Sequence, residues 1–388
     1  MEKVSDTVFS VGCDDYDIDL FESQYKVPNG MAYNSYLIKS EAGPTVLIDT
    51  VDRRKTAEWL DHVEEVLDGK PLDYLLIQHL EPDHSGSIDA LLEKHPNVKV
   101  IASTKAWQMM PNFQVHPIDE KNKIAVKEGD ILDLGDRKLH FVAAPMVHWP
   151  EVIVTYDDKD KILFAADGFG KFGTRDADEP WDEEARRYYL NIVGKYGPQV
   201  QALLKKAAGL DIEKIAALHG PLLTENLGHY ISLYDTWSSY KPEKEGILIL
   251  VASIHGHTNV VAEKMKDMLE AKGQTVKLMD VTRCDVHEAV AQCFVYPKIL
   301  MVACSYDAGV FAPMERMLTI LTHKAFKNRI IGIIQNGSWA PSAAKTMKEI
   351  LAKQQGLTYV EPVVTIKTMM KESDLPEMET LADNLIAA

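Results

Sequence analysis

The chain of 388 residues has few cysteines, and no two of them are spaced as a Cys-x-x-Cys pair. The four are Cys13, Cys284, Cys293 and Cys304. This spacing excludes a zinc ribbon or a rubredoxin-like iron site and gives no sign of a disulfide framework. Free thiols are typical of a reducing compartment, so we expect a cytoplasmic protein.

The sequence also lacks an apolar run long enough to span a membrane and an N-terminal segment of the signal-peptide type. Basic residues are outnumbered, because 42 Lys and Arg face 58 Asp and Glu for a formal net charge of −16. Nucleic acids and anionic membranes repel such a surface, so we expect neither as a partner. The length predicts two globular domains.

What the chain does contain is a dense group of potential metal ligands in residues 78–86, after a short apolar run that predicts a buried strand. The group comprises His79, Glu81, Asp83 and His84. In extended backbone the alternating His79, Glu81 and Asp83 would point to one side and could converge on one ion, while His84 turns toward a second. Imidazole and carboxylate together suit iron, manganese or zinc. A solvated polar turn is the alternative, which the density of ligands disfavours.

Three more candidate ligands stand where predicted strands meet turns that contain Gly or Pro. His148 follows the strand 138–144, Asp167 follows 162–166, and His219 follows 215–218. The histidines without this context are expected to be structural, namely His62, His95, His116, His140 and His229. Many short strands with few helices predict a two-sheet sandwich with helices on its outer faces over residues 1–244.

After a charged, Pro-bearing linker at 240–246 the pattern changes to strict alternation of strand and helix. The predicted strands are 247–252, 275–279, 299–304, 330–334 and 359–366. Five strands in this order predict a doubly wound parallel sheet of the flavodoxin type over residues 245–388.

Three loops at the carboxyl ends of these strands form a second candidate site. The first is rich in hydroxyl groups and opens a helix, which suits a phosphate, yet it is neither Gly-x-Gly-x-x-Gly nor a Walker loop. The other two carry an aromatic and small polar residues, which suit a flat ring, so together they favour FMN over a well-capped helix and two surface turns. The loops comprise Ser253, Ile254, His255, Gly256, His257, Thr258 and Asn259; Ser305, Tyr306, Asp307, Ala308 and Gly309; and Asn336, Gly337, Ser338 and Trp339.

The succession of His-x-Glu-x-Asp-His, His-Trp-Pro, Asp-x-Phe-Gly and His-Gly-Pro before a flavodoxin-like half resembles flavodiiron proteins, or A-type flavoproteins, over essentially the whole length. The resemblance implies an α/β chain: an N-terminal metallo-β-lactamase-like αββα sandwich followed by a flavodoxin-like, doubly wound, five-stranded parallel sheet. It implies two iron ions, one held by His79, Glu81 and His148, the other by Asp83, His84 and His219, with Asp167 bridging them. In hydrolytic relatives the position of Glu81 is usually a zinc-binding histidine, and a carboxylate there favours oxidisable iron.

The function that the resemblance implies is reduction of dioxygen to water, or of nitric oxide to nitrous oxide, with FMN relaying electrons from an external donor. Rubredoxin is the implied donor, and a reduced deazaflavin is the alternative. A head-to-tail homodimer, or a dimer of dimers, would bring each flavin to the partner's irons, and we expect Glu81 and Trp149 beside that approach. Two rival hypotheses are a zinc hydrolase fused to a flavodoxin module and a redox sensor without turnover.

Overall fold

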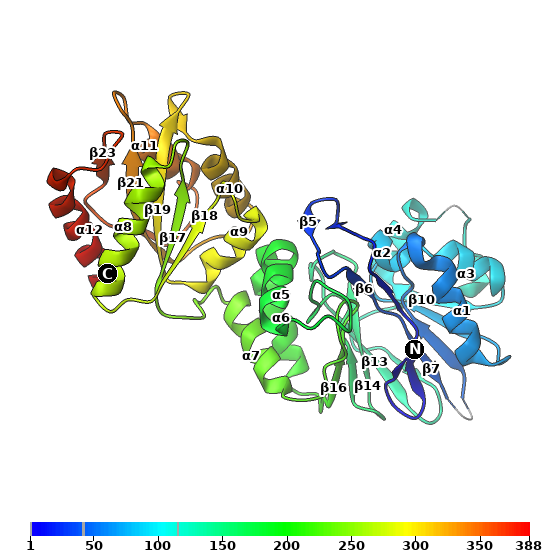
Figure 1. The fold of residues 1–388 in the computed structure, drawn as a ribbon. Coiled ribbons are helices and arrows are strands. Elements are labelled where there is room, and N and C mark those ends of the chain that lie inside the picture. The colour runs from blue at the N-terminus through cyan, green and yellow to red at the C-terminus, as the bar shows by residue number, and fades with distance from the viewer. Residues whose placement is uncertain (1, 41–42, 115) are drawn as a thin grey trace. The chain divides into compact units, whose positions relative to one another are not determined.

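The computed structural model describes residues 2–40, 43–114 and 116–388. The chain divides into two compact units, shown in Figure 1. The first consists of Met1–Tyr189 and Pro198–Asp235, and the second of Leu190–Gly197 and Thr236–Ala388. This division lies nine residues before the domain boundary that we predicted after residue 244, and it assigns Leu190–Gly197 to the second unit.

One sheet of the first unit begins with an antiparallel ribbon and ends with parallel strands. Its order is β1 (Glu2–Lys3), β2 (Val8–Ser10), β7 (Tyr36–Lys39), β8 (Thr45–Ile48), β9 (Tyr74–Ile77), β10 (Lys99–Ser103) and β11 (Lys123–Val126). The parallel strands are joined through α1 (Thr56–Leu67), α2 (Pro82–Ser85), α3 (Ile88–Lys94) and α4 (Thr104–Met109). In Figure 1 these helices lie together beside this sheet.

The other sheet of this unit runs β12 (Ile131–Asp133), β13 (Lys138–Ala143), β14 (Ile153–Asp157), β15 (Ile162–Phe164) and β16 (Lys214–Ala216). The helices around it are α5 (Trp181–Tyr188), α6 (Gly197–Ala207) and α7 (Leu227–Ser238). One buried cluster joins side chains of both sheets, among them Ile48 and Leu76 from the first and Phe141 and Phe164 from the second. The predicted sandwich is therefore confirmed, with its core between the two sheets.

The second unit is the predicted doubly wound parallel sheet. Its order is β18 (Val276–Asp280), β17 (Ile247–Ala252), β19 (Lys298–Tyr306), β21 (Arg329–Asn336) and β22 (Leu357–Tyr359), and β23 (Val364–Ile366) also pairs with β21. The single fifth strand that we predicted over 359–366 is thus two short ones, because Pro362 lies between them and has no N–H to donate to a ladder. A short strand β20 (Gly309–Val310) pairs antiparallel with β19.

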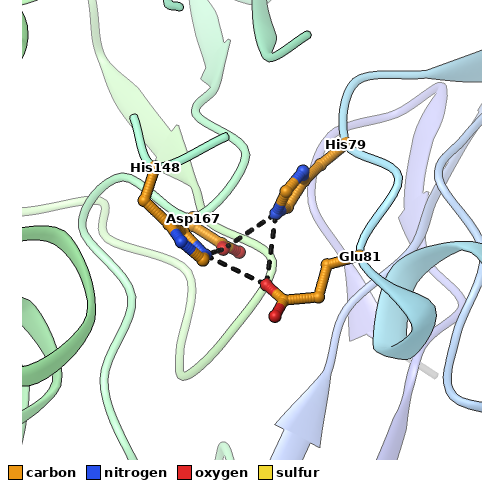
Figure 2. Close-up of side chains that lie close together, drawn as sticks. All are labelled: His79, Glu81, His148 and Asp167. Atoms are coloured by element: carbon orange, nitrogen blue, oxygen red, sulfur yellow. Dashed lines mark hydrogen bonds and ion pairs between the residues drawn. The ribbon is translucent and has the colours of Figure 1, made fainter. Parts of the chain in front are cut away.

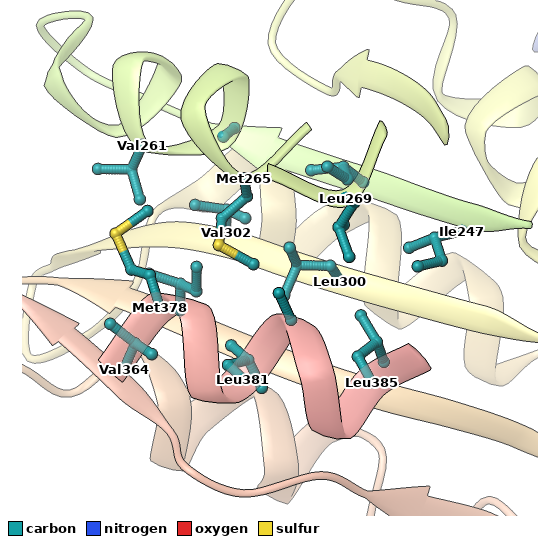
Figure 3. Close-up of a cluster of buried hydrophobic side chains, with 14 of the residues drawn as sticks. Ile247, Val261, Met265, Leu269, Leu300, Val302, Val364, Met378, Leu381 and Leu385 are labelled. Carbon is teal, nitrogen blue, oxygen red and sulfur yellow. The ribbon is translucent and has the colours of Figure 1, made fainter. Parts of the chain in front are cut away.

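Helices cover both faces of this sheet: α8 (His257–Ala271), α9 (Val286–Val295), α10 (Ala312–Thr322), α11 (Ala343–Ile350) and α12 (Leu375–Ala387). Figure 3 shows α8 and α12 packed over the same face, with Met265 and Leu381 meeting Leu300 of the sheet. Their buried residues recur every three or four positions, as one apolar helix face requires. None of the helices in the described ranges combines the length and the apolar character that a membrane crossing needs.

Candidate metal centre and nucleotide pocket

The seven candidate metal ligands follow the carboxyl ends of four strands in the first unit. Four of them lie just beyond β9 of the first sheet. The other three lie beyond β13, β15 and β16 of the second sheet, and these strands run in the same direction because β14 is antiparallel to both of its neighbours. The loops from both sheets therefore meet at one edge of the sandwich.

The prediction that His79, Glu81 and Asp83 point to one side of an extended segment is wrong for Asp83. Pro82 begins α2, where its missing N–H costs nothing and its fixed φ favours the helix. The backbone is extended only as far as Glu81, whose ψ is 140°. Asp83 and His84 leave from the helical turn, and both belong to a different group from His79 and Glu81.

The first group consists of His79, Glu81, His148 and Asp167, whose ligand atoms lie within 4.8 Å of one another. Figure 2 shows the four side chains pointing toward a common centre. His148 Nε2 lies 3.0 Å from Glu81 Oε2 and 3.0 Å from Asp167 Oδ2. His79 Nε2 lies 3.3 Å from the same Glu81 oxygen and 3.4 Å from the same Asp167 oxygen.

The second group consists of Asp83, His84 and His219, all of them buried. Asp83 Oδ2 lies 3.4 Å from His84 Nε2 and 3.3 Å from His219 Nε2. Asp167 reaches this group with its other oxygen, since Oδ1 lies 3.1 Å from His84 Nε2 and 3.7 Å from His219 Nε2. Each oxygen of Asp167 therefore faces one group.

The charges of the cluster hold its protons on the imidazole rings. Burial alone would lower the pKa of His148, but hydrogen bonds to Asp167 and Glu81 outweigh it and raise that pKa to about 9. Burial likewise opposes charge on His79, yet the Asp167 carboxylate and hydrogen bonds raise its pKa well above the usual value. The pKa of His84 is raised against burial by Asp83 and Asp167. Burial favours a neutral Asp167, but the charges of His84 and His79 hold its pKa well below the usual range.

Several polar atoms of the cluster have no hydrogen bond although they are buried. They are both carboxylate oxygens of Asp83, both ring nitrogens of His84 and Oδ1 of Asp167. Buried polar atoms without partners are costly in a native protein, and a bound cation would satisfy the carboxylate oxygens and a ring nitrogen. The two groups of imidazole and carboxylate side chains therefore fit two metal ions, and the donor set suits iron or zinc.

The five histidines that we expected to be structural lie outside both groups. The sequence reading missed Glu151, which is 1% exposed and whose Oε1 accepts hydrogen bonds from His79 Nδ1 (2.8 Å) and Leu80 N (2.9 Å). It also missed Asp49, a buried carboxylate that accepts hydrogen bonds from the backbone of Gln78 and His79. The only sequence signal for Glu151 is its place three residues after His148.

The three predicted loops of the second unit line one open cavity of about 740 Å³. Most of the predicted residues line it, and Gly256, Asn259 and Gly309 do not. The side chain of Asn259 instead bonds to Asp280 of the neighbouring strand. Lining residues outside the prediction are Cys304, Ala340, Pro341, Ser342 and Thr368.

The first loop has the arrangement expected of a phosphate site. Gly256, at φ +87°, precedes the first residue of α8, and Ser253 Oγ accepts hydrogen bonds from the N–H groups of Gly256 (3.0 Å) and Thr258 (3.3 Å). Hydroxyl groups and backbone amides at a helix N-terminus favour an anion. Tyr306 and Trp339 are 51% and 92% exposed, which leaves aromatic surface for a ring to stack on. These features fit a flavin mononucleotide.

Comparisons with known proteins agree with this architecture. A family model described as ODP family beta lactamase matches residues 31–220, and one for flavodoxin matches residues 249–379. The chain is 31% identical to an anaerobic nitric oxide reductase flavorubredoxin of Vibrio vulnificus over 87% of this chain and 70% of that protein. It is 31% identical to a putative diflavin flavoprotein A 2 of Synechocystis over 84% of this chain, and it spans 57% of that relative's length.

Among solved structures, the rubredoxin oxygen:oxidoreductase of the anaerobe Desulfovibrio gigas is similar over the whole chain. The TM-score is 0.91 at 26% sequence identity, and the match covers 100% of this chain and 98% of that one. The similarity thus includes both units, with neither left unmatched.

Proposed function

Because the chain belongs to the flavodiiron protein family, also called A-type flavoproteins, we propose that it is an oxidoreductase that reduces dioxygen to water, nitric oxide to nitrous oxide, or both. The observation that carries the proposal is the pair of ligand groups that share Asp167. A chain with a flavodoxin-type cavity as well has the means to deliver electrons to such a pair. The names of the relatives include both a nitric oxide reductase and an oxygen oxidoreductase.

The side chains that we propose as iron ligands are those of the two groups. His79, Glu81 and His148 would hold one ion, Asp83, His84 and His219 the other, and Asp167 would contact both. Two ferrous ions and a reduced flavin, when bound, supply the electrons for either reduction. The family and the flavodoxin-type unit indicate a diiron centre and FMN as the cofactors.

Glu81 supports iron chemistry over zinc hydrolysis. Its carboxylate lies where hydrolytic relatives usually have a histidine, and it adds negative charge to a position that already has Asp167. Added negative charge stabilises the higher oxidation state of an ion that can change its charge. Zinc has no such state, so the substitution favours a redox-active metal.

Aromatic side chains shield the second group from water. The rings of Phe21, Tyr33 and Tyr188 lie 5.4, 6.1 and 5.5 Å from the ring of His219, centroid to centroid. All three are buried. A dry, apolar wall suits small uncharged diatomic substrates and strengthens the electrostatic interactions of the ligands.

For the flavin, we propose that the phosphate binds at the start of α8, near the hydroxyl groups of Ser253 and Thr258, and that the ring lies against Tyr306 and Trp339. The loop holds no lysine or arginine, so amides, hydroxyl groups and the helix end would bind the anion. Asn336 Nδ2 donates to Thr258 Oγ1 at 3.3 Å, which links two of the three loops.

We also propose a head-to-tail homodimer in which each flavin serves the partner's irons, since a two-fold contact is made twice. Glu81 and Trp149 are the residues that we expect beside the approaching flavin, and Trp149 packs edge-on against His79 with centroids 5.3 Å apart. The rate of electron transfer from flavin to iron should fall on dilution. An undiminished rate in a verified monomer would exclude this route.

The external donor is proposed to be rubredoxin, as the name of the Desulfovibrio relative suggests, with a reduced deazaflavin as the alternative. A cytoplasmic setting is supported by the four cysteines, all of which are free thiols. Reduction of the bound flavin by each candidate donor, followed at the flavin absorbance, distinguishes the two.

The test of the function is anaerobic turnover of one iron-loaded preparation with each diatomic. The wild-type protein should contain two irons and one FMN per chain and should consume dioxygen, nitric oxide or both when its flavin is reduced. Asp167→Asn should lose turnover. Asp158→Asn is the matched control, because Asp158 is an exposed acid that contacts His140 outside both groups. Zinc without iron in protein made with both metals available would overturn the proposal in favour of a hydrolase.

A further inference from the structure

Glu151 is a buried carboxylate that is hydrogen-bonded to His79 Nδ1, the ring nitrogen that faces away from the candidate metal position. One of its oxygens, Oε1, accepts hydrogen bonds from both His79 Nδ1 and the backbone N–H of Leu80, at 2.8 and 2.9 Å. With Nδ1 engaged in this way, Nε2 is the nitrogen that faces Glu81 and Asp167. The side chain of Glu151 is itself 0% exposed, so solvent does not screen its charge.

No other histidine of the two groups has a carboxylate on its second nitrogen within the described part of the chain. The Nδ1 atom of His219 lies 2.7 Å from the backbone carbonyl oxygen of Ala32, which is neutral. The Nδ1 atom of His84 is buried and has no hydrogen bond. Among the described residues, a carboxylate is therefore hydrogen-bonded to the second nitrogen of a ligand ring only in the group that contains His79. The buried carboxylate of Asp49 interacts with His84 of the second group through its charge and without a hydrogen bond.

We propose that Glu151 is a positioning residue that makes the two metal positions unequal, so that iron at the position of His79, Glu81 and His148 is oxidised first. The inference rests on the proposed function, because it needs two iron ions. A carboxylate behind a ligating imidazole fixes its orientation and makes it a stronger donor. Its negative charge also favours the ferric over the ferrous ion. In this step one ferrous ion becomes ferric, and its electron passes to the acceptor, which is the mediator in a redox titration.

Glu151→Gln tests the proposal, because glutamine keeps the length and an acceptor oxygen for both hydrogen bonds but has no charge. The iron-loaded holoprotein, enriched in ⁵⁷Fe, is titrated anaerobically while Mössbauer and EPR spectra follow the mixed-valent state. The wild-type centre should be oxidised in two separate one-electron steps. In Glu151→Gln the step of lower potential should move up while the other stays, so that less mixed-valent protein accumulates. Two steps that stay in place, move together, or shift only at the higher potential would overturn the proposal.

Ser103→Ala is the matched control for a merely structural role. Ser103 Oγ donates to the backbone carbonyl of Glu151 at 2.7 Å, so its loss disturbs the same stretch of backbone without changing the charge. Both potentials should be unchanged in this variant. A shift of the lower step as large as in Glu151→Gln would show that backbone position, and not charge, sets the potential.

Iron content distinguishes the failure of this inference from failure of the proposed function. A wild-type protein with fewer than two irons contradicts the function itself, whereas two irons with unmoved potentials contradict only the role of Glu151. Glu151→Gln should bind the iron at this position about 10–100-fold more weakly. If it does not retain both ions, Glu151→Asp decides, because it keeps the charge. Its two steps should stay separate, and their merging would contradict the proposal.

Discussion

Metal binding to the metal-free protein should release protons, and more of them at one position than at the other. The pKa of His148 is raised to about 9, that of His79 well above its usual value, and that of His84 is raised as well. These rings hold their protons more strongly than a free imidazole does, and a metal ion must displace the proton from each nitrogen that it binds. Two of the three rings belong to the first group and one to the second.

The pH dependence follows from this difference. Each displaced proton makes the apparent binding constant rise about tenfold per pH unit, or about 1.4 kcal/mol. The first position should therefore gain about a hundredfold per pH unit, or about 2.7 kcal/mol, and the second position should gain less. The sign is fixed by the raised pKa values, because higher pH removes the competing protons. The steeper slope should persist until the pH approaches about 9, where His148 loses its proton without help.

Cobalt(II) titrations of the metal-free protein against a chelator, repeated between about pH 6.5 and 8.5, measure both slopes. Calorimetry in two buffers of different ionisation enthalpy counts the released protons independently. His148→Gln should reduce the slope of the first position by about one proton and leave the second unchanged. His140→Gln is the control, since His140 lies outside both groups and pairs with exposed Asp158. Binding that is independent of pH, or equal slopes at the two positions, would refute the reasoning.

Three further predictions concern other parts of the chain. Gly220→Ala should displace His219 and lower the iron content toward one per chain, because Gly220 has φ +80° and a Cβ there would lie 2.7 Å from Lys171 Cγ. Gly209→Ala is the control and should retain both ions, because a Cβ at Gly209 would have no atom within 4 Å. Ser253→Ala should weaken FMN binding about tenfold in a fluorescence titration and weaken riboflavin binding much less, since the hydroxyl lies in the proposed phosphate loop, where it also accepts hydrogen bonds from the N–H groups of Gly256 and Thr258. Arg329→Met should destabilise the second unit by about 3 kcal/mol in urea unfolding. The Arg329 guanidinium is buried, and it donates to five backbone carbonyl groups that methionine would leave without a donor.

Much of the architecture could be predicted because its signals are local. Apolar runs of strand length, each ended by a turn with Gly or Pro, predicted the two-sheet sandwich and the parallel sheet of the flavodoxin type. The same pattern indicated Asp167 and His219 as ligand candidates, since each follows such a run directly. The end of a strand and the polar residue that follows it can be recognised from a few consecutive residues, so a single sequence is enough to predict them.

The same local signals could not predict which ligands share a metal position, or which residues form hydrogen bonds to those ligands. Asp83 belongs to the second group and not to the group of His79, because Pro82 starts a helical turn. The alternation of polar and apolar residues in the sequence does not predict that turn. Glu151 contacts His79 from 72 positions away in the chain, across the space between two sheets. Such a contact depends on how the sheets are packed against each other, which no short window of sequence specifies. Thr368 was missed in the nucleotide pocket for the same reason, because it reaches the pocket through the pairing of β23 with β21, which places its carbonyl oxygen 2.9 Å from Asn336 Nδ2.

The division of the ligands between the two sheets has a consequence for stability. Each group combines side chains from the loop after β9 with side chains that follow strands of the second sheet, His148 and Asp167 in the first group and His219 in the second. Each ion would therefore tie one sheet to the other, and Asp167 would tie both ions to the second sheet. Since neither half of the sandwich can complete a group alone, the ions would bind only the packed state and would stabilise the first unit by mass action. Chelation should then lower the thermal stability of the first unit and leave that of the second unchanged.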